Sequence, residues 1–237
     1  HPIVSCDIQG YSKVICNALL HKFGVTDKTI EDFFKSLDNE YANKLREAFA
    51  PLIKLEQDAI DSKNLEMLTC ILEHGSLEVF NIEHNLSCLS DQLVVVCKTL
   101  KKDGLDDVRS LISRYYGGVY FSYKQAVEID IILENIHRLV SEENRDLFLA
   151  ALLSTASDVV DTVGKHFAQP IKARDSKGNI KVTVYNKAVK DKTIDVVALY
   201  REWLLKYKNL CKSDFQHITM LGDYEQCLKA LPDNVKT

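Results

Sequence analysis

The chain has 237 residues, of which 46% are hydrophobic and 27% charged, and its formal net charge is −4. This much apolar material is enough for a sizeable core and excludes a disordered chain. Glycine and proline are scarce, with nine and four residues, so the composition predicts a predominantly helical protein.

The charges are unevenly distributed along the chain. Residues 165–212 hold twelve Lys or Arg against four Asp or Glu, a local balance of +8 that leaves −12 for the remainder. A basic block within an acidic protein is typical of a surface that binds a polyanion. The alternative interpretation is a solvated helix face with lysines spread around it.

The seven cysteines form no Cys-x-x-Cys pair, and an odd number is not typical of a disulfide framework. Most lie in apolar runs, so we expect free thiols in a reducing, cytoplasmic protein. No apolar stretch reaches the ~20 residues that span a membrane, and no signal peptide opens the sequence, so no membrane partner is expected. The histidines have neither metalloprotease nor zinc-finger spacing, and we predict no metal site.

The first residues predict a strand followed by a helix. Residues 1–7 form a short apolar run that ends in Asp7, and a helical pattern follows from about residue 11 to residue 23. In nucleotide-binding α/β folds, an acid at the carboxyl end of a strand accepts hydrogen bonds from the two hydroxyls of a ribose. Asp7 suits this role, and a local cap or turn is the alternative.

The last residues repeat this pattern. Residues 217–221 predict a strand, Gly222 and Asp223 a turn, and residues 224–231 a short helix. The nine glycines include neither a Gly-x-Gly-x-x-Gly nor a phosphate-binding P-loop motif, so any nucleotide-binding core here has no glycine-rich loop of its own.

Between the two ends, apolar periodicity predicts a series of helices. The expected segments are 29–62 with a break or kink at Pro51, 65–74, 86–102, 106–114, 123–139, 141–163 and 193–209. Asp175–Asn179 predicts a turn, and residues 180–185 alternate as a strand does. We assign the apolar stripes of the helices to the core.

A glycine pair interrupts the helices at residues 114–122. Gly117 and Gly118 stand between aromatic side chains, which predicts a loop that contacts a flat ligand such as a base. A turn packed by its own aromatic side chains is the alternative.

The basic block opens at residues 162–174 with donors of several kinds. Phosphate contact needs cationic donors, and reading a base edge needs bidentate side chains such as Gln or Arg. The candidate residues are Lys165, His166, Gln169, Lys172 and Arg174.

Four segments of the sequence are informative together. They are Cys6–Leu20 (CDIQGYSKVICNALL), Tyr116–Asp130 (YGGVYFSYKQAVEID), Thr162–Pro170 (TVGKHFAQP) and Gly222–Tyr224 (GDY). In this order they resemble bacterial DNA adenine-N6 methyltransferases of the alpha type. Residues 25–105 have no counterpart in the resemblance.

The resemblance implies a predominantly helical α/β fold, with a partial Rossmann-like methyltransferase core and a large helical target-recognition insert. Residues 1–24 and 212–237 would belong to the core, and residues 25–211 to the insert. The implied function is site-specific transfer of a methyl group from S-adenosylmethionine to adenine N6 of DNA, in a restriction-modification or other DNA-modification system. Such an enzyme flips the target base out of the duplex.

The resemblance also implies roles for individual residues. Asp7 would hold the ribose hydroxyls of the cofactor and Asp223 its adenine amino group, with Ile8 and Tyr224 beside them. Basic and polar residues would position the DNA backbone and bases, and the glycine loop would lie near the target base or the cofactor. These DNA contacts are Lys165, His166, Gln169, Lys172 and Arg174, with Tyr116, Gly117, Gly118, Tyr120 and Ser122.

The sequence departs from the family at two motifs. The Phe-x-Gly-x-Gly loop that cradles the methionine part of the cofactor would precede His1, and the catalytic Asp-Pro-Pro-Tyr loop would follow Thr237. The resemblance therefore implies an internal fragment, inactive alone and with no catalytic residue of its own. Its partners would be double-stranded DNA and the remainder of the same enzyme or a restriction enzyme, and its oligomeric state is not predicted.

A competing hypothesis is a non-enzymatic helical module that binds nucleic acid or a protein, with Asp7 and Asp223 as local caps. The geometry of the chain separates the two hypotheses. A methyltransferase requires residues 1–7 and 217–221 to be neighbouring parallel strands, so that the two carboxylates lie about one nucleoside apart. The module hypothesis predicts no such convergence.

Overall fold

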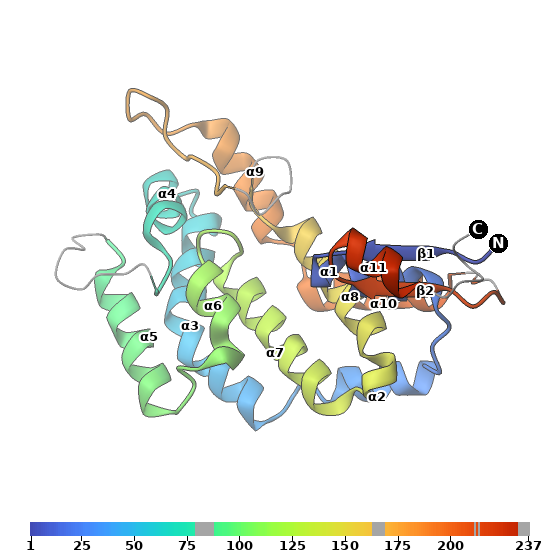
Figure 1. The fold of residues 1–237 in the computed structure, drawn as a ribbon. Helices are drawn as coiled ribbons and strands as arrows, with labels where there is room; N and C mark the ends of the chain where they lie inside the picture. The colour runs from blue at the N-terminus through green and yellow to red at the C-terminus, as the bar shows by residue number, and fades with distance from the viewer. Residues whose placement is uncertain (79–87, 163–168, 211, 213, 232–237) are drawn as a thin grey trace.

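The computed structural model describes residues 1–78, 88–162, 169–210, 212 and 214–231. Within these residues the chain forms a mostly helical body with one small parallel sheet at one end (Figure 1). The elements are β1 (Val4–Asp7), α1 (Gly10–Leu20), α2 (Asp27–Lys35), α3 (Glu40–Asp61), α4 (Leu65–His74), α5 (Ser90–Lys102), the 3₁₀ turn η1 (Val108–Ser110), α6 (Leu111–Tyr116), α7 (Tyr123–Leu139), α8 (Glu142–Val159), α9 (Val182–Lys192), α10 (Val196–Lys208), β2 (Ile218–Leu221) and α11 (Tyr224–Ala230).

The helices share one large apolar core. Helix α3 packs against α7 and α5, and α8 packs against α10, α1 and α7. The buried side chains of these helices form a continuous cluster. Its largest fully buried members are Tyr123, Tyr200, Phe49, Phe121 and Phe148. The predicted amphipathic stripes are therefore core, as expected from their helical spacing.

Of the break or kink expected at Pro51, the break is wrong, because Pro51 lies inside α3 and the helix continues through it. The chain turns instead between α2 and α3, where the Asn39 side chain accepts a hydrogen bond from the Ala42 N–H at 3.0 Å and so begins α3. Pro51 is exposed, so the carbonyl that loses its helical donor faces water and the helix continues.

The expected strand at 180–185 is also wrong. Only Ile180 pairs, in an isolated antiparallel bridge with Arg174, and Val182 begins helix α9. Ala188 of this helix packs with Leu68 and Leu72 of α4 and with Ala173 in a second, small apolar cluster. The β-branched residues at the start of α9 favour a strand locally, and packing against α4 overrides that preference.

Residues 173–181 form a hairpin that projects from the helical body together with α9 (Figure 1). The Lys181 N–H donates to the Ala173 carbonyl, and the Asp175 carboxylate accepts from the N–H groups of Lys177 and Asn179. Gly178 has a φ of +85°, which an L side chain rarely adopts. The turn predicted at Asp175–Asn179 is confirmed.

The structure corrects the expectation that the cysteines are free thiols. Cys70 of α4 and Cys88 are joined by a disulfide, with their Cα atoms 6.9 Å apart. Cys6, Cys16, Cys97 and Cys227 are free. An odd number of cysteines says nothing about which two meet in the fold, and contact between α4 and the residues before α5 decides this pair.

The two ends of the described chain meet in the sheet. β1 and β2 are parallel neighbours, with Val4 opposite Ile218 and Asp7 opposite Leu221. The Ile218 N–H donates to the Ile3 carbonyl and the Gly222 N–H to the Asp7 carbonyl, each at 3.0 Å. The parallel pairing that the methyltransferase hypothesis requires is confirmed.

Large apolar side chains are exposed around this sheet. Among the described residues, they include Ile3, Val4, Ile8, Tyr11, Leu19, Phe215, Leu221, Tyr224 and Leu228. Parallel sheets are normally covered on both faces, and an isolated two-stranded sheet is marginally stable in water.

In the parts of the chain that the structure describes, no helix is long and apolar enough to cross a membrane.

A buried acid, Asp130, holds the start of α6. Its carboxylate accepts from the Ser113 hydroxyl at 2.6 Å and from the N–H groups of Ser113 and Ile112 at 2.7 and 3.0 Å. Asp130 is only 1% exposed. Burial raises its pKa to about 7, although the hydrogen bonds from Ser113 oppose the shift.

Because the folded-state pKa of Asp130 lies above the unfolded value near ~3.9, its contribution to stability is complete below that pH. The contribution is lost as the pH rises toward about 7. We expect the free energy of unfolding of the wild type to fall, relative to Asp130→Asn, by up to about 1.4 kcal/mol per pH unit in this window. Urea unfolding at several pH values measures the difference, and parallel curves for the two proteins would contradict it.

Candidate functional site

Two carboxylates lie at the carboxyl end of the sheet. Asp7 ends β1, and its Oδ1 accepts from the Gln9 N–H at 2.9 Å. Asp223 follows β2 and caps α11 by accepting from the Glu225 N–H at 2.9 Å. The hydrogen bond between Gly222 N–H and the Asp7 carbonyl joins the two strand ends directly. The structure therefore brings Asp7 and the Gly222–Asp223 turn to one edge.

The two strand-end acids keep acceptor capacity for a ligand. The hydrogen bond from Gln9 lowers the pKa of Asp7, so this carboxylate is ionised at neutral pH. Asp223 is exposed, and Ile8 and Tyr224 beside these acids are 73% and 65% exposed. A carboxylate group has two acceptor oxygens, and the backbone donors named above occupy one oxygen of Asp7 and one of Asp223. These acceptor oxygens fit the donor groups of a ribose diol and of an exocyclic amine.

Cys6 borders the same edge from β1. Its Sγ lies 3.5 Å from the Gly222 carbonyl oxygen. Contact with Cys227 of α11 raises the pKa of the Cys6 thiol to about 11. The thiol is therefore protonated at neutral pH and is not a nucleophile there.

The glycine pair forms a tight turn against Tyr123. Gly117, Gly118 and Ser122 are buried, and Gly118 has a φ of +79°. A Cβ on Gly118 would lie 2.7 Å from the Tyr123 ring, and one on Gly117 would lie 2.4 Å from the Ser113 carbonyl oxygen. Both glycines are thus required by the packing of the turn.

The other members of the turn also have structural contacts. Ser122 caps α7 in a reciprocal pair with Gln125. The rings of Tyr116 and Tyr120 pack edge to face with their centroids 5.5 Å apart. Tyr116 and Tyr120 are only half-buried, whereas Ser122 is 4% exposed. The two tyrosines therefore pack against the main core and are only partly accessible to solvent.

A buried ion pair holds this turn in place. The Lys192 ammonium donates to Glu56 Oε1 at 2.9 Å and to the carbonyls of Gly118 and Phe121 at 2.8 and 3.2 Å. The other oxygen of Glu56 accepts from the Tyr123 N–H at 2.8 Å. The Lys192 side chain is fully buried and that of Glu56 is 4% exposed. Helices α3 and α9 are therefore joined through the backbone of the turn.

The sequence alone does not predict a buried ion pair at Glu56 or Lys192. Glu56 occupies a core position on α3, in register with the buried Leu45, Phe49 and Leu52, and a charged residue in such a stripe is the signal that could identify it. Lys192 was counted with the basic block, and nothing in its local sequence separates it from exposed lysines.

The described part of the 162–174 segment lies beside the glycine turn. A pocket of about 500 Å³ is lined by Gln169, Lys172 and Arg174 together with Val119 of the turn. Leu72, Glu73, Pro170, Ile171 and Ala173 complete the lining. Lys165 and His166 lie outside the described residues. The structure thus brings three of the five predicted basic or polar residues against the predicted base-contact loop.

Arg174 already has acidic partners in α4. Its Nη2 donates to Glu66 Oε2 at 3.1 Å and its Nε to Glu73 Oε2 at 3.2 Å. Its Nη1 donates to the Gly178 carbonyl at 3.2 Å. The carboxylates raise the pKa of the guanidinium, and they offset its charge. Neither glutamate was predicted to belong to the site.

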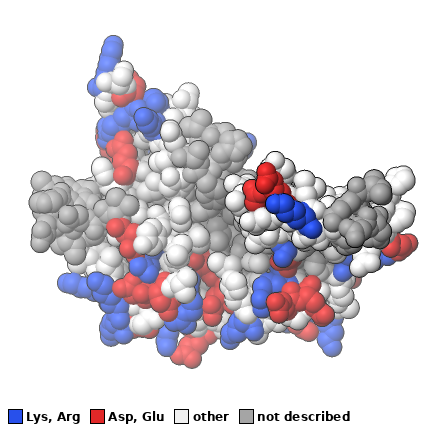
Figure 2. Space-filling view, in the orientation of Figure 1, with Lys and Arg blue, Asp and Glu red and all other residues white. Residues whose placement is uncertain are grey.

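The basic block does not form a single face. Lys172, Lys177 and Lys190 are exposed on the hairpin and α9, whereas Lys187 pairs with Asp191 at 2.9 Å and with the buried Asp161 at 3.5 Å. The cations of α10 lie elsewhere, against the helical body. Figure 2 shows Lys and Arg atoms over the projecting hairpin, and a mixture of both signs along the lower part of the same face.

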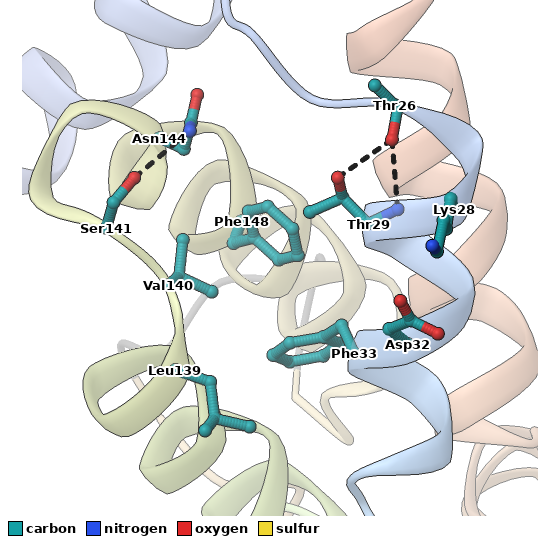
Figure 3. A pocket seen from close by; sticks show the side chains of 10 residues that line it. All are labelled: Thr26, Lys28, Thr29, Asp32, Phe33, Leu139, Val140, Ser141, Asn144 and Phe148. Atoms are coloured by element: carbon teal, nitrogen blue, oxygen red, sulfur yellow. Dashed lines mark hydrogen bonds between the residues drawn. The ribbon is translucent and has the colours of Figure 1, made fainter.

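A second pocket lies between α2 and the junction of α7 with α8 (Figure 3). Phe33, Val140 and Phe148 supply its apolar wall. Its polar side chains bond to one another, Thr26 with Thr29 and Asn144 with Ser141. None of the predicted site residues lines this pocket.

Within the described ranges, no group of three or more His, Cys, Asp or Glu could hold a metal ion.

Comparison with known proteins gives one similarity. Over 153 residues the chain is 31% identical to the Type II methyltransferase M.CviAII of Paramecium bursaria Chlorella virus 1. The match covers 60% of this chain and 45% of that protein, so the chain spans less than half of its relative's length. No family model matches the chain, and no solved structure matches it.

The buried ion pair makes a prediction about stability. Lys192→Met leaves Glu56 without its cation, and we expect it to lower the free energy of unfolding by about 3–5 kcal/mol. The matched control is the exposed Lys190→Met in the same helix, with an expected change within about 0.5 kcal/mol. A Glu56→Met/Lys192→Met double variant should recover part of the loss. Equal stability of the two single variants in urea unfolding would contradict a structural role for the pair.

The glycine turn makes a second prediction. Gly118 and Gly178 both have positive φ, but only Gly118 has neighbouring atoms where a Cβ would stand. We expect Gly118→Ala to lower the free energy of unfolding by about 1–3 kcal/mol more than Gly178→Ala. Thermal and urea unfolding of the two variants measure the difference. Equal losses would mean that backbone strain alone, and not packing on Tyr123, requires glycine at this position.

Proposed function

We propose that the chain is part of a DNA methyltransferase that uses S-adenosylmethionine and acts on adenine N6. The main support is the parallel pairing of β1 with β2, which sets Asp7 and Asp223 at one edge of the sheet. The similarity to M.CviAII over 153 residues agrees with this class of enzyme. The choice of adenine N6 rests on the order and content of the four sequence segments.

In this proposal the strand-end acids hold the adenosine part of the cofactor. Asp7 accepts from the ribose hydroxyls and Asp223 from the adenine amino group, with Ile8 and Tyr224 against the ring. S-adenosylmethionine supplies the methyl group that is transferred. The strand order places these residues outside the carboxyl ends of parallel strands, where α/β folds bind nucleotides. The sheet and its flanking helices would then form part of a Rossmann-like core, with residues 25–211 as the recognition insert.

The DNA contacts of the proposal lie on the projecting hairpin and beside it. Lys172 and Lys177 are exposed there, and Gln169 and Arg174 line the pocket beside the glycine turn that also holds Tyr116 and Tyr120. Phosphate contacts of this kind give affinity that falls with salt, and base contacts give sequence preference. Lys165 and His166 lie outside the described residues and belong to the proposal on the sequence alone.

We further propose that the 237-residue chain alone does not transfer a methyl group. No segment of it matches the Phe-x-Gly-x-Gly or Asp-Pro-Pro-Tyr loops, which hold the methionine part and the reacting amine in the family that it resembles. The remainder of such an enzyme is the partner that fits the exposed apolar side chains around β1 and β2. Labelled methyl incorporation into duplex DNA by the chain alone would contradict this part of the proposal.

Cofactor binding gives the direct test. We expect S-adenosylmethionine at millimolar concentration to shift the amide NMR signals of Asp7, Ile8, Asp223 and Tyr224, because the adenosine contacts alone support an affinity near ~1 mM. Asp7→Asn should weaken binding about tenfold, since it removes the ionised acceptor of the ribose hydroxyls. The control is Asp58→Asn, which changes an exposed acid of α3 far from the sheet. The cofactor site is wrong if these four amide signals do not shift, or if Asp7→Asn and Asp58→Asn bind S-adenosylmethionine equally well.

A further inference from the structure

We propose that the pocket between α4, the glycine turn and residues 169–174 binds one unstacked nucleotide of the DNA. In this proposal the phosphate replaces Glu66 and Glu73 as the partner of Arg174. The inference rests on the proposed function, because it takes nucleic acid as the ligand. It goes further by assigning a pocket, an orientation of the nucleotide and a competition between carboxylates and phosphate.

The inner part of the pocket suits a base. Its volume of about 500 Å³ lies within the range of ~300–1,000 Å³ typical of small-molecule sites. Leu72 and Ile171 are buried at its floor, and Val119 and Pro170 form apolar walls. Gln169 supplies an amide that can both donate to and accept from a base edge. A flat ring with a polar edge matches this lining.

The outer part of the pocket suits a phosphate. Lys172 is exposed at the rim, and the guanidinium of Arg174 lies beside it with a side chain 36% exposed. Lysine and arginine are the usual partners of phosphate oxygens, and arginine can bind two of them at once. The neighbouring hairpin carries the exposed Lys177, which continues the cationic surface beyond the pocket, and the half-buried Lys181, whose ammonium donates to the Lys172 carbonyl at 3.3 Å. The ligand is therefore one nucleotide of a longer strand, which these lysines contact on one side.

The α4 carboxylates compete for this phosphate site. Glu66 and Glu73 both bond to Arg174, and together with Lys172 they leave the four side chains with no net charge. Glu66 is 75% exposed, so its bond to Arg174 is readily exchanged in water. A phosphate takes the place of the carboxylates only when Lys172 and the neighbouring hairpin lysines also contact the strand. Arg174 is thus the residue that binds the phosphate, and Glu66 and Glu73 hold its side chain in place when no DNA is bound.

The test measures binding of fluorescent single-stranded oligonucleotides by anisotropy at low salt, with a base-containing strand and an abasic strand of equal length. We expect the wild type to prefer the base-containing strand about tenfold. Val119→Trp and Pro170→Trp each add a large ring to the lining of the pocket and should abolish this preference while leaving binding of the abasic strand unchanged. Two filling variants are used so that a folding defect in one, detected by circular dichroism, leaves the other informative.

The competition of Glu66 and Glu73 with a phosphate for Arg174 gives a second prediction. Glu66→Gln/Glu73→Gln should tighten binding of both strands by roughly tenfold, since it frees Arg174 and removes two negative charges. The control is Glu142→Gln/Glu143→Gln, which makes the same change of net charge at the exposed start of α8. Arg174→Gln should cancel the gain in the double variant.

The outcomes separate this inference from the proposed function. If the wild type binds DNA but the filling variants keep the base preference, or both glutamate double variants bind equally, then the pocket assignment is wrong and the proposed function stands. If the wild type binds neither oligonucleotides nor duplex DNA, both are wrong.

Discussion

The buried ion pair between Glu56 and Lys192 is the contact that ties α3, α9 and the glycine turn together. It joins α3 to α9 and uses the backbone of residues 118–123 as the link, so the glycine turn, the start of α7 and the base of the hairpin are positioned together. Removing two charges from water is expensive, and the pair is stable because the Lys192 ammonium has three acceptors and each Glu56 oxygen has a donor. This constraint places Val119 against Gln169 and Arg174.

The candidate sites lie on separate parts of the molecule. The cofactor acids stand at the edge of the small sheet, whereas the nucleotide pocket is lined by residues of α4, the glycine turn and 169–174. The hairpin projects from the helical body away from the sheet (Figure 1). A methyltransferase must bring a cofactor and a flipped base together, and the residues that do so in the family have no match in this sequence. The described chain therefore supplies recognition and part of cofactor binding in the proposal, and another polypeptide segment supplies the chemistry.

Sequence periodicity predicted most elements because the helices are amphipathic and begin at recognisable caps. Helices α4 and α7 begin and end at the residues that the pattern predicts. The two strands and α11 lie within one to three residues of their predicted bounds. The failures come from the tertiary surroundings of each residue, which local patterns do not contain. Pro51 is tolerated because it faces water, α9 forms because Ala188 packs on α4, and Cys70 meets Cys88 through a contact between elements.

The sequence by itself determined the helical class, the positions of the strand-end acids Asp7 and Asp223, and the basic character of residues 165–212. These follow from local pattern and composition, which need no knowledge of contacts. Only the tertiary structure decided that β1 and β2 are neighbours, that Lys192 is buried and that Arg174 is held by Glu66 and Glu73. Each of these depends on which distant residues meet. Because burial and pairing set the energy of a charge, the role of a lysine or arginine cannot be assigned before the fold is known.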